Sequence, residues 1–339
     1  MDSFRRIVAI AIIALPMATS AREQLRIVGS STVFPFVAAA AEQFGRAEKF
    51  RTPIVEATGT GGGLKVFCEG IGDEHPDIAN ASRTIKQSEI NLCAKHGITE
   101  ITELRLGYDG IVLANARASE TFALTRKNLF LALAREVPKN GKLVANPYRK
   151  WNEIDASLPN VTITIYGPPP SSGTRDAFVE LIMDAGCKQI PEMKQAMPNE
   201  KNLKHACEAM REDGAFVEAG EDDNLIVQKL INNRDALGVF GYSFLEANSA
   251  LVKANPIDGV VPNYDAIENG TYHVARSLYV YIKNAHLDKV PGLREFAREL
   301  ASDAASGEDG YLVMKGLLPL NDADHAAMKK VAAELVPLK

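Results

Sequence analysis

Glycine and small hydroxyl residues follow short apolar runs at several places in this chain, and a helical pattern begins directly after each run. Three such junctions lie in Leu25–Phe36, Pro53–Lys65 and Ile163–Phe178, with the turns GSST, TGTGGG and PPPSSGT. A weaker copy, Asp77–Lys86, has Asn, Ser and Arg at the turn but no Gly. A junction of this kind presents unpaired backbone N–H groups and hydroxyls at the positive end of a helix dipole. Four junctions from distant parts of one chain predict a socket for a small oxyanion, held mainly by neutral donors.

Each junction also has a structural interpretation that needs no ligand. Ser30–Thr32 can be a plain helix N-cap ahead of Pro35. Gly59–Gly63 can be a flexible turn, although four glycines in five residues favour a close approach of the backbone to another group. For Ser171–Thr174 the socket is favoured, because three preceding prolines stiffen the loop.

The N-terminal segment has the pattern of a secretory signal peptide. Arg5 and Arg6 form a basic start, Ile7–Leu15 is an apolar core, and Thr19–Ala21 supplies small residues for cleavage near Ala21. The apolar core is shorter than the roughly 20 residues that span a bilayer. We therefore expect residues 1–21 to be removed and the mature protein to be exported.

Length and charge narrow the class of protein further. Removal of 21 of the 339 residues leaves 318, which exceeds one typical core and predicts two domains of about 150 residues. The net charge of −5 becomes −6 once Asp2, Arg5 and Arg6 are removed. This balance, without Lys or Arg runs among aromatic residues, argues against a nucleic-acid partner. An acidic protein must bind an anion locally, with aimed dipoles and one or two guanidinium groups.

Four cysteines remain in the mature chain: Cys68, Cys93, Cys187 and Cys207. In an exported protein an even number favours disulfides, and four cysteines allow three connectivities. Pairing of sequence neighbours, Cys68 with Cys93 and Cys187 with Cys207, is the simplest and would keep each bridge within one domain. Four buried free thiols are the alternative. No CxxC or HxxxH spacing points to zinc, and we expect no metal site.

Runs of apolar and β-branched residues alternate with helical patterns along the mature chain. The runs predict strands at Leu25–Val28, Pro53–Ala57, Gly110–Ala114, Val161–Tyr166, Leu237–Gly241 and Leu278–Lys283. Helical patterns occupy Pro35–Phe44, Gly63–Gly70, Lys86–His96, Arg175–Ala185, Asp222–Asn232 and Leu293–Ala305. This alternation predicts an α/β architecture with parallel sheets. Open sheets of this class bind ligands beyond the carboxyl ends of their strands, where the Gly, Ser and Thr turns lie.

These motifs, in this order, resemble the periplasmic phosphate-binding proteins of ABC transporters. The resemblance begins with GSSTVFPF, TGTGGGLK, DIANASRTIKQSE, GYDGIVLAN and SSGTRDAF, and it continues with ALGVFGYSFLE, ARSLYVYIK and GEDGYLVMKGLLPL. It covers nearly the whole mature chain. Each motif alone is weak, whereas their order and spacing together are specific.

The resemblance implies a two-lobed α/β fold of the type II binding-protein class, with the ligand in the cleft between the lobes. Each lobe would hold a mixed, mainly parallel sheet flanked by helices. The chain would cross between the lobes near Gly107–Gly110 and Tyr272–Arg276. Lobe 1 would then comprise residues 22–109 and 274–339, and lobe 2 residues 110–273.

The resemblance also implies a function without catalysis or a cofactor. A protein of this family captures inorganic phosphate in the periplasm by closing its lobes over the anion. It then delivers the phosphate to the permease subunits of an ABC transporter in the inner membrane. We expect this chain to do so as a monomer.

Carried over by position, the family motifs assign the ligand-binding groups to three loops. All of these groups are donors of the kind that a fully ionised oxygen needs. They are Ser31, Thr32 and the Val33 backbone in the first loop, Thr60 and Gly61 in the second, and Ser172, Gly173 and Thr174 in the third.

Two positions depart from the family pattern. Ser82, followed by Arg83, stands where many members carry an Asp that accepts a hydrogen bond from protonated phosphate and repels sulfate. Pro168 stands where many members have an Arg. Arg175 then becomes the leading cation, with Arg83 second, and Asp109 becomes the candidate acceptor.

Alternatives remain for these residues and for the function. Asp109 can be a hinge residue that hydrogen-bonds a turn, and Arg175 can form an ion pair with Asp176 or Glu180. The ligand can be another oxyanion, such as sulfate, tungstate or arsenate. An exported phosphate-responsive enzyme or accessory protein on the same fold is the other alternative. No GxSxG or HExxH motif and no grouping of the six His residues favours an enzyme.

Overall fold

The structure is a computed structural model that describes residues 22–47, 49–170, 172–220 and 223–338. The expected signal peptide, residues 1–21, lies outside the described residues. Within the described ranges, every helix is too short or too polar to span a bilayer.

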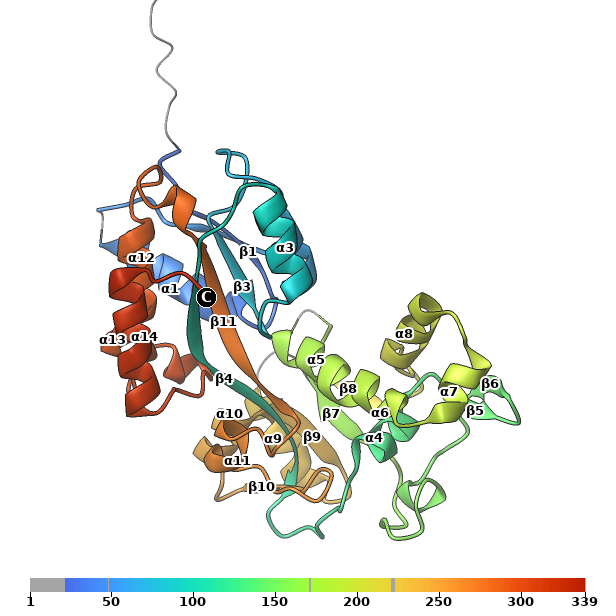
Figure 1. Cartoon of the computed structure of the whole chain (residues 1–339). Helices are drawn as coiled ribbons and strands as arrows, with labels where there is room; N and C mark the ends of the chain where they lie inside the picture. The colour runs from blue at the N-terminus through green and yellow to red at the C-terminus, as the bar shows by residue number, and fades with distance from the viewer. Residues whose placement is uncertain (1–21, 48, 171, 221–222, 339) are drawn as a thin grey trace, which may run out of the picture.

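A mixed sheet of nine strands runs through the molecule (Figure 1). The strands follow the order β2-β1-β3-β11-β4-β9-β7-β8, and β10 pairs with β4 off this path. Their bounds are Arg26–Gly29 (β1), Ile54–Ala57 (β2), Ile78–Ala81 (β3), Ile101–Ala116 (β4), Ile165–Gly167 (β7), Phe216–Glu218 (β8), Leu237–Gly241 (β9), Val252–Ala254 (β10) and Ala275–Lys283 (β11). A separate hairpin consists of β5 (Glu136–Lys139) and β6 (Lys142–Ala145).

The two longest strands, β4 and β11, join two groups of shorter strands. β11 pairs with the first part of β4, from Lys283 opposite Ile101 to Ala275 opposite Gly110. Beyond Gly110, β4 pairs with β9. We call β1, β2, β3, β11 and residues 101–110 of β4 the first half of the sheet. The second half comprises β7 to β10 and the rest of β4 (Figure 1).

Strand direction places the loops that follow β1, β2 and β3 at one edge of the first half. β1 is parallel to both β2 and β3, whereas β11 is antiparallel to β3 and β4. In the second half β7 is parallel to β8 and β9, and β4 is antiparallel to β9. The carboxyl ends of parallel strands meet at one edge, which is where open α/β sheets bind ligands.

Helices pack around each half of the sheet (Figure 1). Those of the first half are α1 (Phe34–Arg46), α2 (Thr60–Phe67), α3 (Gln87–Lys95), α12 (Leu293–Leu300), α13 (Asp303–Ser306) and α14 (Asp322–Glu334). Those of the second half are α4 (Arg126–Leu133), α5 (Gly173–Phe178), α6 (Ala185–Lys188), α7 (Pro191–Ala196), α8 (Glu200–Glu208), α9 (Asp223–Asn232), α10 (Tyr242–Ala247) and α11 (Tyr264–Glu268). A π-helical segment, Val179–Asp184, joins α5 to α6.

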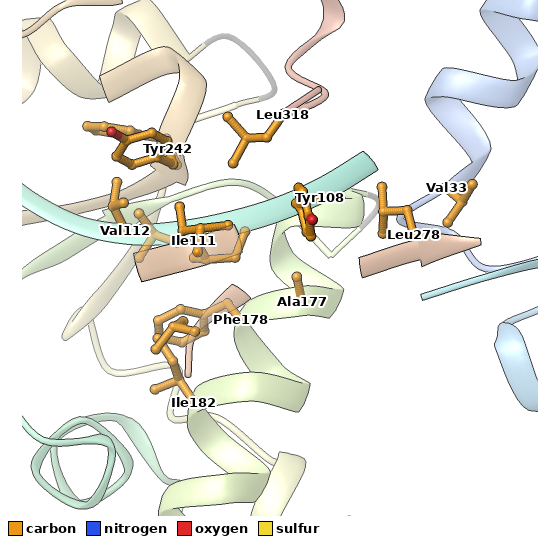
Figure 2. Close-up of a cluster of buried hydrophobic side chains, with 14 of the residues drawn as sticks. Val33, Tyr108, Ile111, Val112, Ala177, Phe178, Ile182, Tyr242, Leu278 and Leu318 are labelled. Atoms are coloured by element: carbon orange, nitrogen blue, oxygen red, sulfur yellow. The ribbon is translucent and has the colours of Figure 1, made fainter. Parts of the chain in front are cut away.

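One apolar core extends across both halves of the sheet. Figure 2 shows Leu278 next to Val33 in the first half, and Phe178 with Ile182 in the second, with Tyr108 of β4 between them. All five side chains are buried. Val33 belongs to the turn after β1, and Phe178 belongs to the helix after β7. The core therefore holds these two strand-helix junctions close together.

Every predicted strand and helix overlaps an observed one, but several bounds differ. The predicted strand Gly110–Ala114 is only the second part of β4. The predicted helix Arg175–Ala185 is α5 followed by the π-helical segment, and Leu293–Ala305 is divided into α12 and α13. The expectation of parallel sheets is met only in part, because β4 and β11 run antiparallel to their neighbours. Apolar periodicity predicts strands but carries no direction, so it could not show this.

The two disulfides confirm the pairing of sequence neighbours. Cys68 at the end of α2 is bonded to Cys93 of α3, in the first half. Cys187 of α6 is bonded to Cys207 of α8, in the second half. None of the four cysteines is free, and each bridge stays within one half.

We predict that replacing Cys187 and Cys207 together by Ser lowers the free energy of unfolding by about 3 kcal/mol. The bridge closes a short loop in the unfolded chain, since its two ends are 20 residues apart in sequence. Denaturant unfolding of the variant and the wild type measures the difference. Peptide mapping of the wild type without reductant should link the same two pairs, and finding free thiols would contradict both statements.

A buried cluster of charged groups lies at the far end of β11. Lys283 is fully buried, and its Nζ donates to the Gly70 carbonyl over 2.6 Å. Burial lowers the pKa of Lys283 to about 8, against the opposing effect of the Asp77 carboxylate. Asp77 is itself buried and hydrogen-bonded to Arg22 and to His286 Nδ1.

The lowered pKa of Lys283 predicts a stability that rises with pH. Between pH 8 and about 10 the unfolded chain keeps the lysine proton while the folded chain releases it, so raising the pH favours the folded state. The free energy of unfolding should rise across this window by about 1 kcal/mol per pH unit relative to Lys283→Met. Denaturant titrations of both proteins at several pH values measure the difference. A constant difference would contradict the prediction.

Candidate functional site

The first loop connects β1 to α1. Gly29 has φ +139°, and a Cβ there would lie 2.1 Å from the Asn80 carbonyl oxygen, so only glycine fits. Ser30 N donates to that same oxygen over 3.0 Å, and the Ser30 carbonyl accepts from the first amide of α1. These bonds fix the path of the loop. They leave Ser31 and Thr32 at its tip, where both side chains contact residues far away in sequence.

The second loop connects β2 to α2 and lies against the loop after β3. Thr60 Oγ1 is 3.1 Å from Ser82 Oγ and accepts from Ser82 N over 3.1 Å. A Cβ on Gly63 would lie 2.4 Å from the Gly29 Cα, so one glycine of the run is in close contact with another segment. The group approached is the backbone of β1. Gly61, by contrast, has open space beside it.

The third loop precedes α5 and meets the first loop across the two halves of the sheet. A Cβ on Gly173 would lie 3.0 Å from the Ser31 carbonyl oxygen and 3.0 Å from the Thr32 Cα. One turn further along α5, the Asp176 carboxylate accepts a hydrogen bond from Ser31 Oγ. Ser172 and Thr174, which flank Gly173, therefore lie beside the first loop.

The two arginines predicted as cations both have partners. Arg83 makes two hydrogen bonds to the Glu89 carboxylate, of 2.9 and 2.8 Å, and this pairing raises the pKa of Arg83. The Arg175 guanidinium lies 4.1 Å from the centroid of the Phe216 ring and donates to the Pro168 carbonyl over 3.3 Å. Burial lowers the pKa of Arg175. Binding of a ligand by either arginine stays a prediction.

Arg276 is a third guanidinium at the site, and the sequence did not single it out as a ligand. Its side chain is only 7% exposed. Nη2 donates to Thr32 Oγ1 over 2.5 Å, and Nη1 donates to Glu180 Oε2 over 2.5 Å. Nε lies 3.8 Å from Asp109 Oδ2. Arg276 therefore contacts the first loop, the helix after the third loop and the strand that joins the halves.

Asp109 lies directly opposite Arg276 in the β4–β11 ladder. Its side chain is 13% exposed, and Oδ2 has no hydrogen-bond partner among the described residues. Burial raises the pKa of Asp109, and the Arg276 guanidinium opposes that shift. A role as acceptor for a bound ligand stays a prediction for Asp109.

Asn80 is a further polar residue that the sequence did not assign to the site. It is fully buried in β3 beside Gly29, and its amide nitrogen and oxygen have no hydrogen-bond partner among the described residues. A buried amide without a partner is an unused donor at the foot of the first loop. The signal in the sequence was the Asn at the turn of the fourth junction, Asp77–Lys86.

The arrangement offers hydrogen-bond donors and a guanidinium. A contact between Ser and His also occurs, between α13 and α14. Ser306 Oγ does lie 3.2 Å from His325 Nε2, and His325 Nδ1 lies 3.5 Å from Asp303. Ser306 is nevertheless 1% exposed, and its hydroxyl donates to the Leu300 carbonyl over 2.7 Å. Among the described residues no group of His, Cys, Asp or Glu could hold a metal ion. The donors and the guanidinium at the site are groups that can bind an anion.

Comparison with known proteins defines the class to which this fold and site belong. Residues 16–304 match the family described as the PBP superfamily domain. Because this match covers most of the chain, the chain belongs to that superfamily.

Proteins similar to this chain include relatives named SphX and PstS. The chain is 30% identical to protein SphX of Synechococcus elongatus, over 90% of this chain and 82% of that protein. It is 29% identical to the phosphate-binding protein PstS of Staphylococcus saprophyticus, over 84% of this chain and 78% of that protein. A solved structure of a possible phosphate binding protein from Planctomyces limnophilus matches with a TM-score of 0.72 and 26% identity, over 92% of this chain and 98% of that chain. The family resemblance inferred from the motifs is thus confirmed.

Proposed function

We propose that this protein is the solute-binding component of an ABC transporter and that it binds inorganic phosphate between two lobes. The observation that carries the proposal is the contact between the first and third loops. Gly173 at the start of α5 lies against Ser31 and Thr32 at the start of α1. The N-terminal ends of two helices, from opposite halves of the sheet, meet here, and such ends favour anions. The relative named phosphate-binding protein PstS supports phosphate as the anion.

In this proposal the two halves of the sheet are the two lobes. Lobe 1 comprises residues 22–109 and 274–339, and lobe 2 comprises residues 110–273. The chain crosses between them near Gly107–Gly110 and Tyr272–Arg276. A rotation about these two crossings would separate the first loop from the third and open the site to solvent. Closure over the anion is then a hinge motion of the β4–β11 pair.

Neutral donors supply most of the proposed binding contacts. A phosphate oxygen loses its hydration when the lobes close, and short charge-assisted hydrogen bonds offset that loss. The acceptor of the phosphate proton is Asp109, and Arg175 and Arg83 supply positive charge. The donors are Ser31, Thr32, the Val33 amide, Thr60, Gly61, Ser82, Ser172, Gly173 and Thr174.

The protein acts in the periplasm as a monomeric carrier. The signal-peptide pattern in residues 1–21 supports export. A carrier that closes over its ligand presents one defined shape to the permease subunits in the inner membrane. Delivery to an ABC permease follows from this shape change. The protein needs no cofactor and no nucleic-acid partner.

We predict that inorganic phosphate binds the anion-stripped protein and raises its melting temperature. A ligand at about 100 times its dissociation constant stabilises the folded chain by roughly 2.7 kcal/mol. Isothermal titration and thermal unfolding with phosphate, sulfate, molybdate and arsenate measure affinity and selectivity. A clear response to another anion with none to phosphate would reject the ligand. Turnover of a chromogenic phosphate ester would instead favour an enzyme.

We predict that Arg175→Ala weakens phosphate binding about ten- to a few-hundredfold, because a hydrogen bond to a charged group contributes about 1.5–3 kcal/mol. Arg175→Lys should recover only part of the affinity, because an ammonium group lacks the planar fork of the guanidinium. Isothermal titration measures the affinity, and thermal unfolding measures the stability of the same samples.

The exposed Arg149, which precedes β7 and lies in the proposed lobe 2, provides a matched control as Arg149→Ala. A purely structural Arg175, held against Phe216, would give a lower melting temperature with near-normal affinity. That outcome would make Arg83, in place of Arg175, the predicted cation of the site.

A further inference from the structure

Two carboxylates of lobe 2 occupy donors of lobe 1. Asp176 of α5 accepts from Ser31 Oγ, and Glu180 of the π-helical segment accepts from Arg276 Nη1 over 2.5 Å. Asp176 and Glu180 are four residues apart on one continuous helical stretch, so their side chains project from the same side of it. Both interactions link the two halves of the sheet at the meeting point of the first and third loops.

The donors engaged by these carboxylates are ones that an oxyanion would need. Ser31 Oγ is a proposed ligand of the anion. Arg276 donates a hydrogen bond to Thr32, the residue after Ser31. The two terminal nitrogens of Arg276 point to Thr32 and Glu180, and Nε faces Asp109 without a hydrogen bond. An anion at the first loop would therefore lie near the Arg276 guanidinium. In the present structure that guanidinium is hydrogen-bonded to the Glu180 carboxylate of lobe 2.

The exposed fractions of the two side chains indicate which partner of the Arg276–Glu180 ion pair can move away. The Arg276 side chain is 7% exposed, whereas the Glu180 side chain is 57% exposed. Asp176 is exposed as well. A carboxylate near solvent is rehydrated when it swings away, so breaking its ion pair costs little. Once Glu180 has left, the buried guanidinium keeps the Asp109 carboxylate 3.8 Å from Nε but has lost its hydrogen-bonded anionic partner, and a bound anion can replace that partner.

We propose that Asp176 and Glu180 form a carboxylate latch, which holds Ser31 and Arg276 while the site is empty and releases them to the bound oxyanion. Arg276 is then the cation at the base of the site, between the two lobes. This inference rests on the proposed function. The latch keeps the empty lobes together and competes with the ligand for the same donors.

Because the latch carboxylates compete with the anion for Ser31 and Arg276, we predict that neutralising either carboxylate strengthens phosphate binding. Glu180→Gln should bind inorganic phosphate about three- to fivefold more tightly than the wild type, the range expected for a partly exposed ion pair. Asp176→Asn should act in the same direction. In both variants the empty protein should melt at a lower temperature, and phosphate should raise the melting temperature by more than in the wild type. Glu192→Gln, an exposed carboxylate of α7, is the matched control and should change neither quantity.

Arg276 is tested in the same titrations. Arg276→Ala should weaken phosphate binding about ten- to a few-hundredfold, and Arg276→Lys should restore part of the affinity. A folded Arg276→Ala variant with near-normal affinity would overturn the assignment of the cation. If Arg276→Ala does not fold, Arg276→Lys and Glu180→Gln still decide the question. Unchanged or weaker binding by Glu180→Gln would overturn the latch.

The wild-type titration separates this inference from the function on which it rests. A wild type that binds no phosphate rejects the proposed function. If the wild type binds phosphate and Glu180→Gln binds it no more tightly, the latch alone fails. A tighter Glu180→Gln with a larger thermal shift supports both.

Discussion

The pairing of β4 with β11 is the constraint on which the rest of the structure depends. The ladder runs from Ile101 opposite Lys283 to Gly110 opposite Ala275, and β4 then continues as a strand of the second half. Because one strand belongs to both halves, a change in its path moves the two halves relative to each other. The same ladder places Asp109 opposite Arg276, so the two charged groups of the junction are held in register by backbone hydrogen bonds.

A buried guanidinium at this junction requires partners, and they come from three separate parts of the chain. Thr32 lies 244 residues before Arg276, Glu180 lies 96 residues before it, and Asp109 is on the neighbouring strand. Removing a cation from water is unfavourable unless hydrogen bonds and opposite charge compensate. The need to satisfy Arg276 therefore draws the turn after β1 and the helix after β7 toward the same point. The apolar contacts around Val33 and Phe178 act in the same direction.

Close backbone packing brings the first two loops together without any charge. Gly63 of α2 and Gly29 of β1 approach so closely that a Cβ on Gly63 would lie 2.4 Å from the Gly29 Cα. The helix after β2 can lie against the end of β1 only because neither residue has a side chain. Thr60 then reaches Ser82 in the loop after β3. Three neighbouring strands thus end in loops that touch one another, which concentrates hydroxyl and amide donors at one edge of the sheet.

Local patterns in the sequence were sufficient to predict the α/β class and the strand-helix junctions. Alternation of apolar runs with helical patterns depends on neighbouring residues alone, and a glycine run marks close approach wherever it lies. The order of the motifs along the chain also predicted the protein family. The nearest-neighbour disulfides, Cys68–Cys93 and Cys187–Cys207, followed from the simplest connectivity, but their selection among three needed the structure.

Only the tertiary structure decided strand direction and the partners of the charged side chains. Periodicity does not reveal that β11 lies antiparallel between β3 and β4, because direction depends on how distant segments pack. The sequence placed Arg276 at a crossing between lobes and gave it no ligand role, since its partners are far away in sequence. The pairing of Arg83 with Glu89 is likewise visible only in the folded chain. Long side chains reach across the fold, so their roles are set by the folded neighbourhood rather than by sequence spacing.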